Sequence, residues 1–68
     1  MREYAISVVG MGANGVATTL KEIFGTSDEL KPTNGVAMGS TFTEVDTGDI
    51  FLFNETTGEW VNQFSLQG

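Results

Sequence analysis

Three β-prone runs separated by short turns make up the carboxyl-terminal third of the chain. The runs are TFTEV at residues 41–45, DIFLF at residues 49–53 and EWVNQF at residues 59–64. β-Branched and aromatic residues, which favour strands, supply at least half of each run. The connections, DTG at 46–48 and NETTG at 54–58, contain glycine and have the length of hairpin loops. The pattern predicts a three-stranded antiparallel meander over residues 41–64.

The middle run carries apolar side chains on both of its faces. Because successive strand residues point to opposite sides, Ile50 and Leu52 face one way while Phe51 and Phe53 face the other. A strand that is apolar on both faces is expected in a sheet that is covered twice. A helix of the chain can cover one face. Either residues 1–9 or a second subunit must then cover the other, and the sequence leaves both possibilities open.

The amino-terminal part predicts one strand and one helix. Residues 4–9 read YAISVV, which favours a strand or an extended arm over residues 1–9. In segment 15–24, apolar residues recur at i, i+4, i+7 and i+8, the stripe of a short amphipathic helix. These residues are Val16, Leu20, Ile23 and Phe24. Asn14 is placed to cap the start of this helix, and Gly25 stands where helices commonly end.

The predicted fold is therefore α+β within one small domain spanning residues 1–68. It consists of a small, three- to four-stranded, mainly antiparallel sheet with one short amphipathic helix. Residues 26–40 are predicted to be a connection, because Pro32 disfavours helix before it and Asn34-Gly35 is a turn signal.

The length of the chain limits how stable such a fold can be alone. At 68 residues, a domain buries only about 60% of its unfolded surface, so small scaffolds usually need a further source of stability. The sequence contains neither cysteine nor histidine, which excludes disulfides and removes the commonest transition-metal ligands. We therefore expect a homo-oligomer, with a trimer as one candidate, or docking onto a partner.

Charge and hydropathy exclude several classes of partner. Nine acidic residues against three basic ones give a net charge of −6, and the three bases are scattered. No basic surface is available to neutralise phosphates, so we expect no nucleic-acid partner. Apolar stretches are far shorter than the ~20 residues of a membrane span, and the first residues lack the apolar core of a signal peptide. We expect no membrane partner and synthesis in the cytoplasm.

Gly10, Gly12 and Gly15 match the G-x-G-x-x-G pattern of dinucleotide-binding proteins. The match follows a predicted strand and precedes a predicted helix, as the fingerprint requires. A second parallel strand ending in an acid should follow the helix, whereas residues 31–35 read KPTNG, a turn. Nucleotide binding through these glycines is therefore a remote alternative to a tightly turned connection.

No group of residues in the sequence predicts catalysis or metal binding. The acidic residues of the predicted meander are Glu44, Asp46, Asp49, Glu55 and Glu59. They stand at turns and at alternating strand positions, where solvated acids are normal, and they lack the spacing of a calcium loop. No histidine or cysteine is present to activate a serine or threonine. We expect no enzymatic activity, no cofactor, and no catalytic or metal-ligating residue.

Aromatic residues are the remaining candidates for a binding surface. Tyr4, Phe51, Phe53 and Trp60 are candidates for a platform that binds sugars or a peptide, although the hydrophobic core of a small sheet is the better explanation of them. Residues 1–9 are expected to contact a neighbouring subunit. The interface or binding candidates are Tyr4, Ile6, Val8, Phe51, Phe53 and Trp60.

Part of the sequence resembles a hairpin module of small structural proteins from tailed bacteriophages. Residues 39–48 read GSTFTEVDTG and residues 50–54 read IFLFN, and Trp60 follows. The resemblance is limited to about residues 35–62. Such proteins are head-fibre, decoration or tail-appendage components. Within the module, Asp46 and Thr47 can bind turn amides, and Gly48 can adopt the positive φ of the bend.

The resemblance implies a non-enzymatic structural protein of a phage virion, either a capsid decoration or a component of a head or tail appendage. It implies that other virion proteins are the partners and that the protein resides in the virion after synthesis in the host cytoplasm. The alternative is a small carbohydrate-binding or adhesion module, which predicts that Trp60 or Phe51 faces the solvent.

Overall fold

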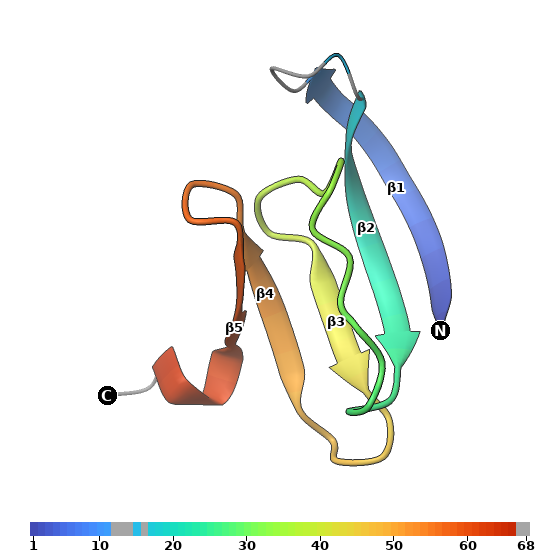
Figure 1. Cartoon of the computed structure of the whole chain (residues 1–68), viewed down its shortest axis with the longest axis vertical. Coiled ribbons are helices and arrows are strands. Elements are labelled where there is room, and N and C mark those ends of the chain that lie inside the picture. The colour runs from blue at the N-terminus through green and yellow to red at the C-terminus, as the bar shows by residue number, and fades with distance from the viewer. Residues whose placement is uncertain (12–14, 16, 67–68) are drawn as a thin grey trace.

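The computed structural model describes residues 1–11, 15 and 17–66 of the chain. These residues form one five-stranded sheet in the order β1-β2-β3-β4-β5, followed by a 3-10 helix (Figure 1). The elements are β1 (Arg2–Met11), β2 (Ala17–Gly25), β3 (Thr41–Glu44), β4 (Ile50–Asn54), β5 (Glu59–Asn62) and η1 (Gln63–Leu66).

The sheet is mixed because one of its pairings is parallel. β1 pairs with β2 antiparallel, and β3, β4 and β5 pair antiparallel in succession. The predicted meander is therefore present, although its last residues belong to η1. β2 and β3 pair in parallel, which requires a connection that returns along the sheet. Residues 26–40 make that return as an irregular segment lying across one face of the sheet (Figure 1).

The predicted α+β fold with an amphipathic helix over residues 15–24 is wrong. Ala17–Gly25 is strand β2, and no α-helix occurs among the described residues. The apolar residues of this short segment fit the period of a strand as well as that of a helix. In the strand, Ile23 is fully buried on one face, while Leu20 and Phe24 lie on the other. Backbone pairing with β1 and β3 outweighs the weak preference of so short a segment for a helix. The predicted cap Asn14 and Val16 lie outside the described residues.

Gly25 has a role in packing rather than in ending a helix. A Cβ at this position would lie 2.7 Å from Cζ of Phe42 and 2.9 Å from Oε1 of Glu29. Both distances are shorter than any normal van der Waals contact of a carbon atom. Glycine at the end of β2 therefore lets the ring of Phe42 lie directly against the backbone.

The core lies between one face of the sheet, here called the covered face, and the connection 26–40. Ile23, Phe42 and Phe51 are aligned across β2, β3 and β4 on this face. Ile23 and Phe42 are fully buried, as are Val36 and Ala37 of the connection to within 2%. Backbone hydrogen bonds of 2.9 Å from the Thr19 amide to the Gly35 carbonyl and from the Ala37 amide to the Thr19 carbonyl hold the connection against β2.

Two long side chains hold the rest of the connection on the covered face. The Nζ atom of Lys31 lies 4.8 Å from the ring centre of Phe42 and 4.3 Å from that of Phe51. The indole nitrogen of Trp60 donates a 2.8 Å hydrogen bond to the carbonyl oxygen of Pro32. The apolar stem of a lysine covers aromatic surface while its charge remains near the edge, so an irregular segment can close this core.

β1 extends the sheet at its edge and does not cover a face. Eight of its ten residues pair with β2, and all ten are exposed. Register shifts between Ala5 and Ser7 and between Val8 and Gly10 mark irregularities of the β-bulge type in this strand. The structure thus pairs residues 2–11 within the chain, but the second face of the sheet stays without the cover that the sequence requires.

Candidate interface: the open face of the sheet and strand β1

The second face of the sheet, here called the open face, is defined by the register of the strands. Residues opposite each other on neighbouring strands share a face. One row across the sheet contains Tyr4, Glu22, Thr41, Leu52 and Val61. The adjacent row contains Arg2, Phe24, Thr43 and Ile50. Connection 26–40 lies on the other side, so these rows receive none of the cover that it provides.

The apolar residues of the open face are only partly removed from solvent. Tyr4 is 48% exposed, and Phe24, Ile50, Leu52 and Val61 are half-buried. The rings of Tyr4 and Phe24 meet edge to face with their centroids 6.0 Å apart, which joins β1 to β2 across this face. The open face thus carries apolar side chains of β1, β2, β4 and β5, with Thr41 and Thr43 of β3 between them. A surface of this kind on a small protein indicates an interaction site.

Strand β1 adds a second exposed apolar surface beside the open face. Ile6 is 59%, Val8 69%, Val9 57% and Met11 70% exposed. The outer half of the β1–β2 hairpin projects beyond β3, because β2 pairs with that strand only over residues 22–25 (Figure 1). A long exposed edge strand is a ready template for contact with another chain, and the bulges limit how regularly such a chain can pair.

The six candidate residues from the sequence separate into two groups. Tyr4, Ile6 and Val8 lie on exposed β1. Phe51, Phe53 and Trp60 belong to the covered face, where the Phe53 and Trp60 ring centroids are 5.0 Å apart and Phe53 is 3% exposed. The rings of these three residues therefore pack in or beside the core, and the N–H group of Trp60 already has a protein acceptor.

The sequence did not single out four residues that complete the open face: Phe24, Ile50, Leu52 and Val61. The alternation within residues 50–53 carried the signal, since it placed Ile50 and Leu52 on a face that had to meet something. Phe24 was hidden by the interpretation of its segment as a helix.

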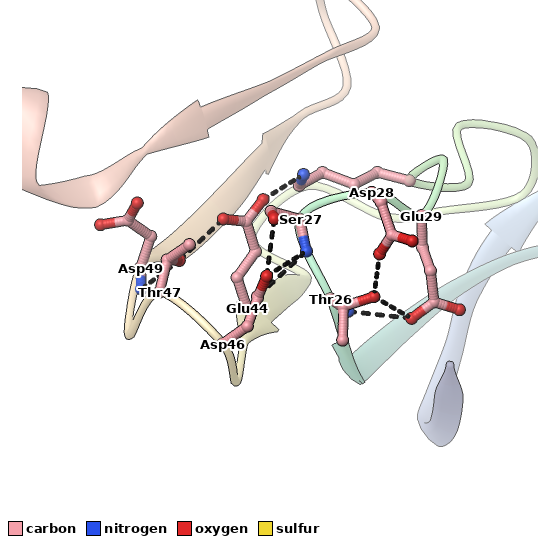
Figure 2. A network of polar contacts seen from close by, with 9 residues as sticks. Thr26, Ser27, Asp28, Glu29, Glu44, Asp46, Thr47 and Asp49 are labelled. Carbon is pink, nitrogen blue, oxygen red and sulfur yellow. Dashed lines mark hydrogen bonds and ion pairs between the residues drawn. The ribbon is translucent and has the colours of Figure 1, made fainter.

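A network of polar contacts ties the turn after β2 to the turn between β3 and β4 (Figure 2). Glu44 is 5% exposed, and its carboxylate accepts hydrogen bonds of 2.7 Å from Lys31 Nζ and 2.8 Å from Thr47 Oγ1. Asp46 accepts bonds from the Ser27 amide at 3.0 Å and from Ser27 Oγ at 2.6 Å. The acidic residues were expected to be solvated, so the burial of Glu44 is a correction.

These bonds lower the pKa of both carboxyl groups. The pKa of Glu44 is below its ordinary value mainly because Lys31 and then Thr47 donate to the charged form. The pKa of Asp46 is lowered mainly by the hydrogen bond from Ser27. Both carboxyl groups are therefore ionised at neutral pH and hold the two turns together. Gly48, with a φ of +80°, completes the bend between β3 and β4.

The neighbouring residues 26–29 form a turn with hydrogen bonds among their own side chains. Oε1 of Glu29 accepts a 2.8 Å hydrogen bond from the Thr26 amide, and the Thr26 hydroxyl donates to Asp28. The amino group of Met1 lies 2.9 Å from Oε2 of Glu29 and, by its hydrogen bond, is the main cause of the lowered pKa of this carboxyl. The carboxylates of Glu29 and Asp28 thus accept hydrogen bonds from the chain itself. Among the described residues, no three acidic side chains are grouped so as to hold a metal ion.

The glycine motif does not occupy the context that dinucleotide binding requires. Gly10 lies in β1 and the motif leads into β2, an antiparallel strand, whereas the fingerprint needs a helix there. Gly12 lies outside the described residues. Gly10 is paired with Thr18 of β2, and Gly15 lies between the two antiparallel strands.

Comparison with protein-family models, with curated proteins and with solved structures found no match. None of the described segments forms a helix long and apolar enough to cross a membrane. No pocket is present among the described residues. The open face and β1 are therefore the features from which a function can be argued.

Proposed function

We propose that the chain is a non-enzymatic structural subunit that acts through protein–protein contacts made by the open face and strand β1. One observation carries the proposal: a five-stranded sheet is covered on one face and leaves Tyr4, Phe24, Ile50, Leu52 and Val61 partly exposed on the other. Burying apolar surface stabilises an assembly by about 25 cal/mol per Å². A partner that covers this face would supply stability that so small a core lacks.

The resemblance of residues 35–62 to small phage proteins narrows the setting of this proposal. The assembly would be a phage virion, in which the chain decorates the capsid or belongs to a head or tail appendage. Its partners would be other virion proteins, in addition to copies of itself. The residues that carry the resemblance build the β3–β4 hairpin and its turn, including the bond of 3.2 Å from the Asp49 amide to Thr47 Oγ1.

A carbohydrate-binding module is the alternative, and the placement of the aromatic rings speaks against it. A sugar platform needs an aromatic face in contact with solvent together with polar groups at its rim. Trp60 and Phe51 lie on the covered face beneath the connection 26–40, and Trp60 uses its N–H group within the chain. Tyr4 is 48% exposed on the open face, and the Phe24 ring beside it is half-buried and meets it edge to face, so no second exposed ring extends this surface into a platform.

Site-specific photocrosslinking in the cell or particle that contains the chain tests the proposal. A photoreactive phenylalanine analogue replaces Tyr4, which keeps an aromatic ring on the open face. The control places the same group at Thr33, an exposed position on the connection over the covered face. We expect strong crosslinks to protein from position 4 and weak ones from position 33. Equal crosslinking from both positions, or none from position 4, would contradict the proposal.

A further inference from the structure

Two opposite charges at the β1–β2 edge of the open face lack an ion-pair partner within the described part of the chain. They are Arg2 on β1 and Glu22 on β2, and both are exposed. The other two basic side chains are engaged, since Lys21 pairs with Glu3 at 3.1 Å and Lys31 pairs with Glu44 at 2.7 Å. Among the described residues, Arg2 is therefore the one basic side chain without such a pair.

Arg2 and Glu22 flank the aromatic contact at the edge of the open face. Arg2 lies opposite Phe24, and Glu22 lies opposite Tyr4. The rings of Tyr4 and Phe24 contact each other along one diagonal of this group of four, and the two charges occupy the other diagonal. The charges thus stand beside an apolar surface, where an ion pair with another molecule would be shielded from solvent.

The remainder of the open face is nearly free of charge, although the chain is acidic. Of the nine acidic residues, only Glu22 and Glu59 lie on this face by register, and Glu59 is at the start of the short edge strand β5. Between these two acids, β3, β4 and β5 place Thr41, Leu52 and Val61 on this face. Repulsion between two chains of net charge −6 is therefore weakest if they meet through this face.

The area of the open face is similar to the area that a specific interface buries on each partner. The molecule measures 34 × 28 × 18 Å, so a rectangle around its broad side has an area of roughly 950 Å² (34 × 28). A standard specific interface buries about 800 Å² on each partner. A partner that covers most of the face therefore meets this size, whereas a single added strand or a short peptide would leave most of it exposed.

We propose that the occupant of the open face is a second copy of this chain, related by a two-fold axis that brings Arg2 of each copy to Glu22 of the other. In a two-fold interface every contact between residues i and j occurs twice, so one positive and one negative side chain are sufficient for two ion pairs. The two sheets pack face to face and bury the rows that contain Leu52 and Ile50. This inference rests on the proposed function, because it names the partner of the same surface.

Charge reversal tests the inference on the full chain. Sedimentation velocity across the micromolar range is expected to show a dimer. Arg2→Glu and Glu22→Arg should each raise the dimer dissociation constant by about tenfold or more, because each reversal places like charges opposite each other twice. The double variant should return the constant to within about threefold of the parent. The control Glu55→Arg makes the same change of charge as Glu22→Arg, but on the β4–β5 turn, and it should leave the dimer intact.

The outcomes separate this inference from the proposed function. Circular dichroism should show that all variants keep their strands, since Arg2, Glu22 and Glu55 are exposed. A dimer that is unaffected by the reversals, or one that the double variant does not restore, would overturn the two-fold arrangement, as would a trimer. A monomer whose position 4 crosslinks to a different protein would overturn the second copy and leave the proposed function standing. A monomer without crosslinks would end both.

Discussion

Replacing Gly25 by alanine is expected to destabilise the chain, although glycine-to-alanine changes in regular structure usually stabilise. The added methyl group would lie 2.7 Å from Cζ of Phe42, whereas carbon atoms in contact lie about 3.5–4.0 Å apart. The ring must therefore move by roughly 0.8 Å. Phe42 is fully buried and packs against Trp60 at a centroid distance of 6.0 Å, so its side chain has little free space to enter.

The expected cost follows from the behaviour of overfilled cores. Forcing extra methyl groups into a well-packed interior usually costs about 1–3 kcal/mol. Total stability at this chain length is about 3–10 kcal/mol, so the loss is a large fraction of it. Urea denaturation followed by the fluorescence of Trp60, the single tryptophan, measures the change. Protein concentration must be held constant, because association would contribute to the apparent stability.

Two companion variants make this measurement decisive. Gly10→Ala is the matched control, since a Cβ at Gly10 of β1 meets nothing within 4 Å. It should change the stability by less than about 1 kcal/mol, in the stabilising direction. Phe42→Leu removes the nearer of the two clashing atoms, Cζ of the ring, so Gly25→Ala should cost less in that background than alone. If Gly25→Ala is as stable as the parent or more so, the close approach of Phe42 to the end of β2 is wrong.

Three further changes test other parts of the structure. Because the pKa of Glu44 is lowered in the folded chain, its carboxylate contributes fully to the free energy of unfolding above the ordinary pKa of 4.5. This contribution is lost as the pH falls through the folded-state pKa. Glu44→Gln should therefore flatten the acid side of a curve of stability against pH, measured by urea denaturation. Trp60→Phe removes the 2.8 Å bond to Pro32 and should cost about 0.5–1.5 kcal/mol in thermal unfolding; no loss would contradict that bond. Leu52→Thr should change the stability of the monomer by less than about 1 kcal/mol but weaken association, and the reverse result would place this residue in the core.

The meander was predictable because its signals are local. Alternating apolar residues and glycine-containing turns over residues 41–62 depend on neighbours close in sequence, and the structure places β3, β4 and β5 there. Strand β2 was not predictable in this way. Its apolar residues fit a helix and a strand about equally, and the choice was made by backbone pairing with β1 and with β3, which lies some twenty residues further along the chain.

The candidate interface was predictable in part for the same reason. The sequence predicted residues 1–9 to be a strand or arm that contacts a neighbour, and Tyr4, Ile6 and Val8 in it are exposed. Phe51 and Trp60 do not belong to the candidate interface because the irregular connection 26–40 lies over them. No periodic pattern in residues 26–40 indicates that Lys31 crosses two rings to reach Glu44. Long-range contacts of single side chains leave no signal in a sequence taken alone.

The requirement for a second cover can still be derived from the sequence and the topology together. Residues 50–53 need apolar neighbours on both sides, and the chain contains two segments long enough to supply them. Connection 26–40 lies over one face, while residues 2–11 pair at the edge of the sheet and cover neither face. No other described segment of comparable length remains. The proposed cover for Ile50 and Leu52 is therefore another molecule, and the charges of Arg2 and Glu22 at the border of that surface favour a second copy.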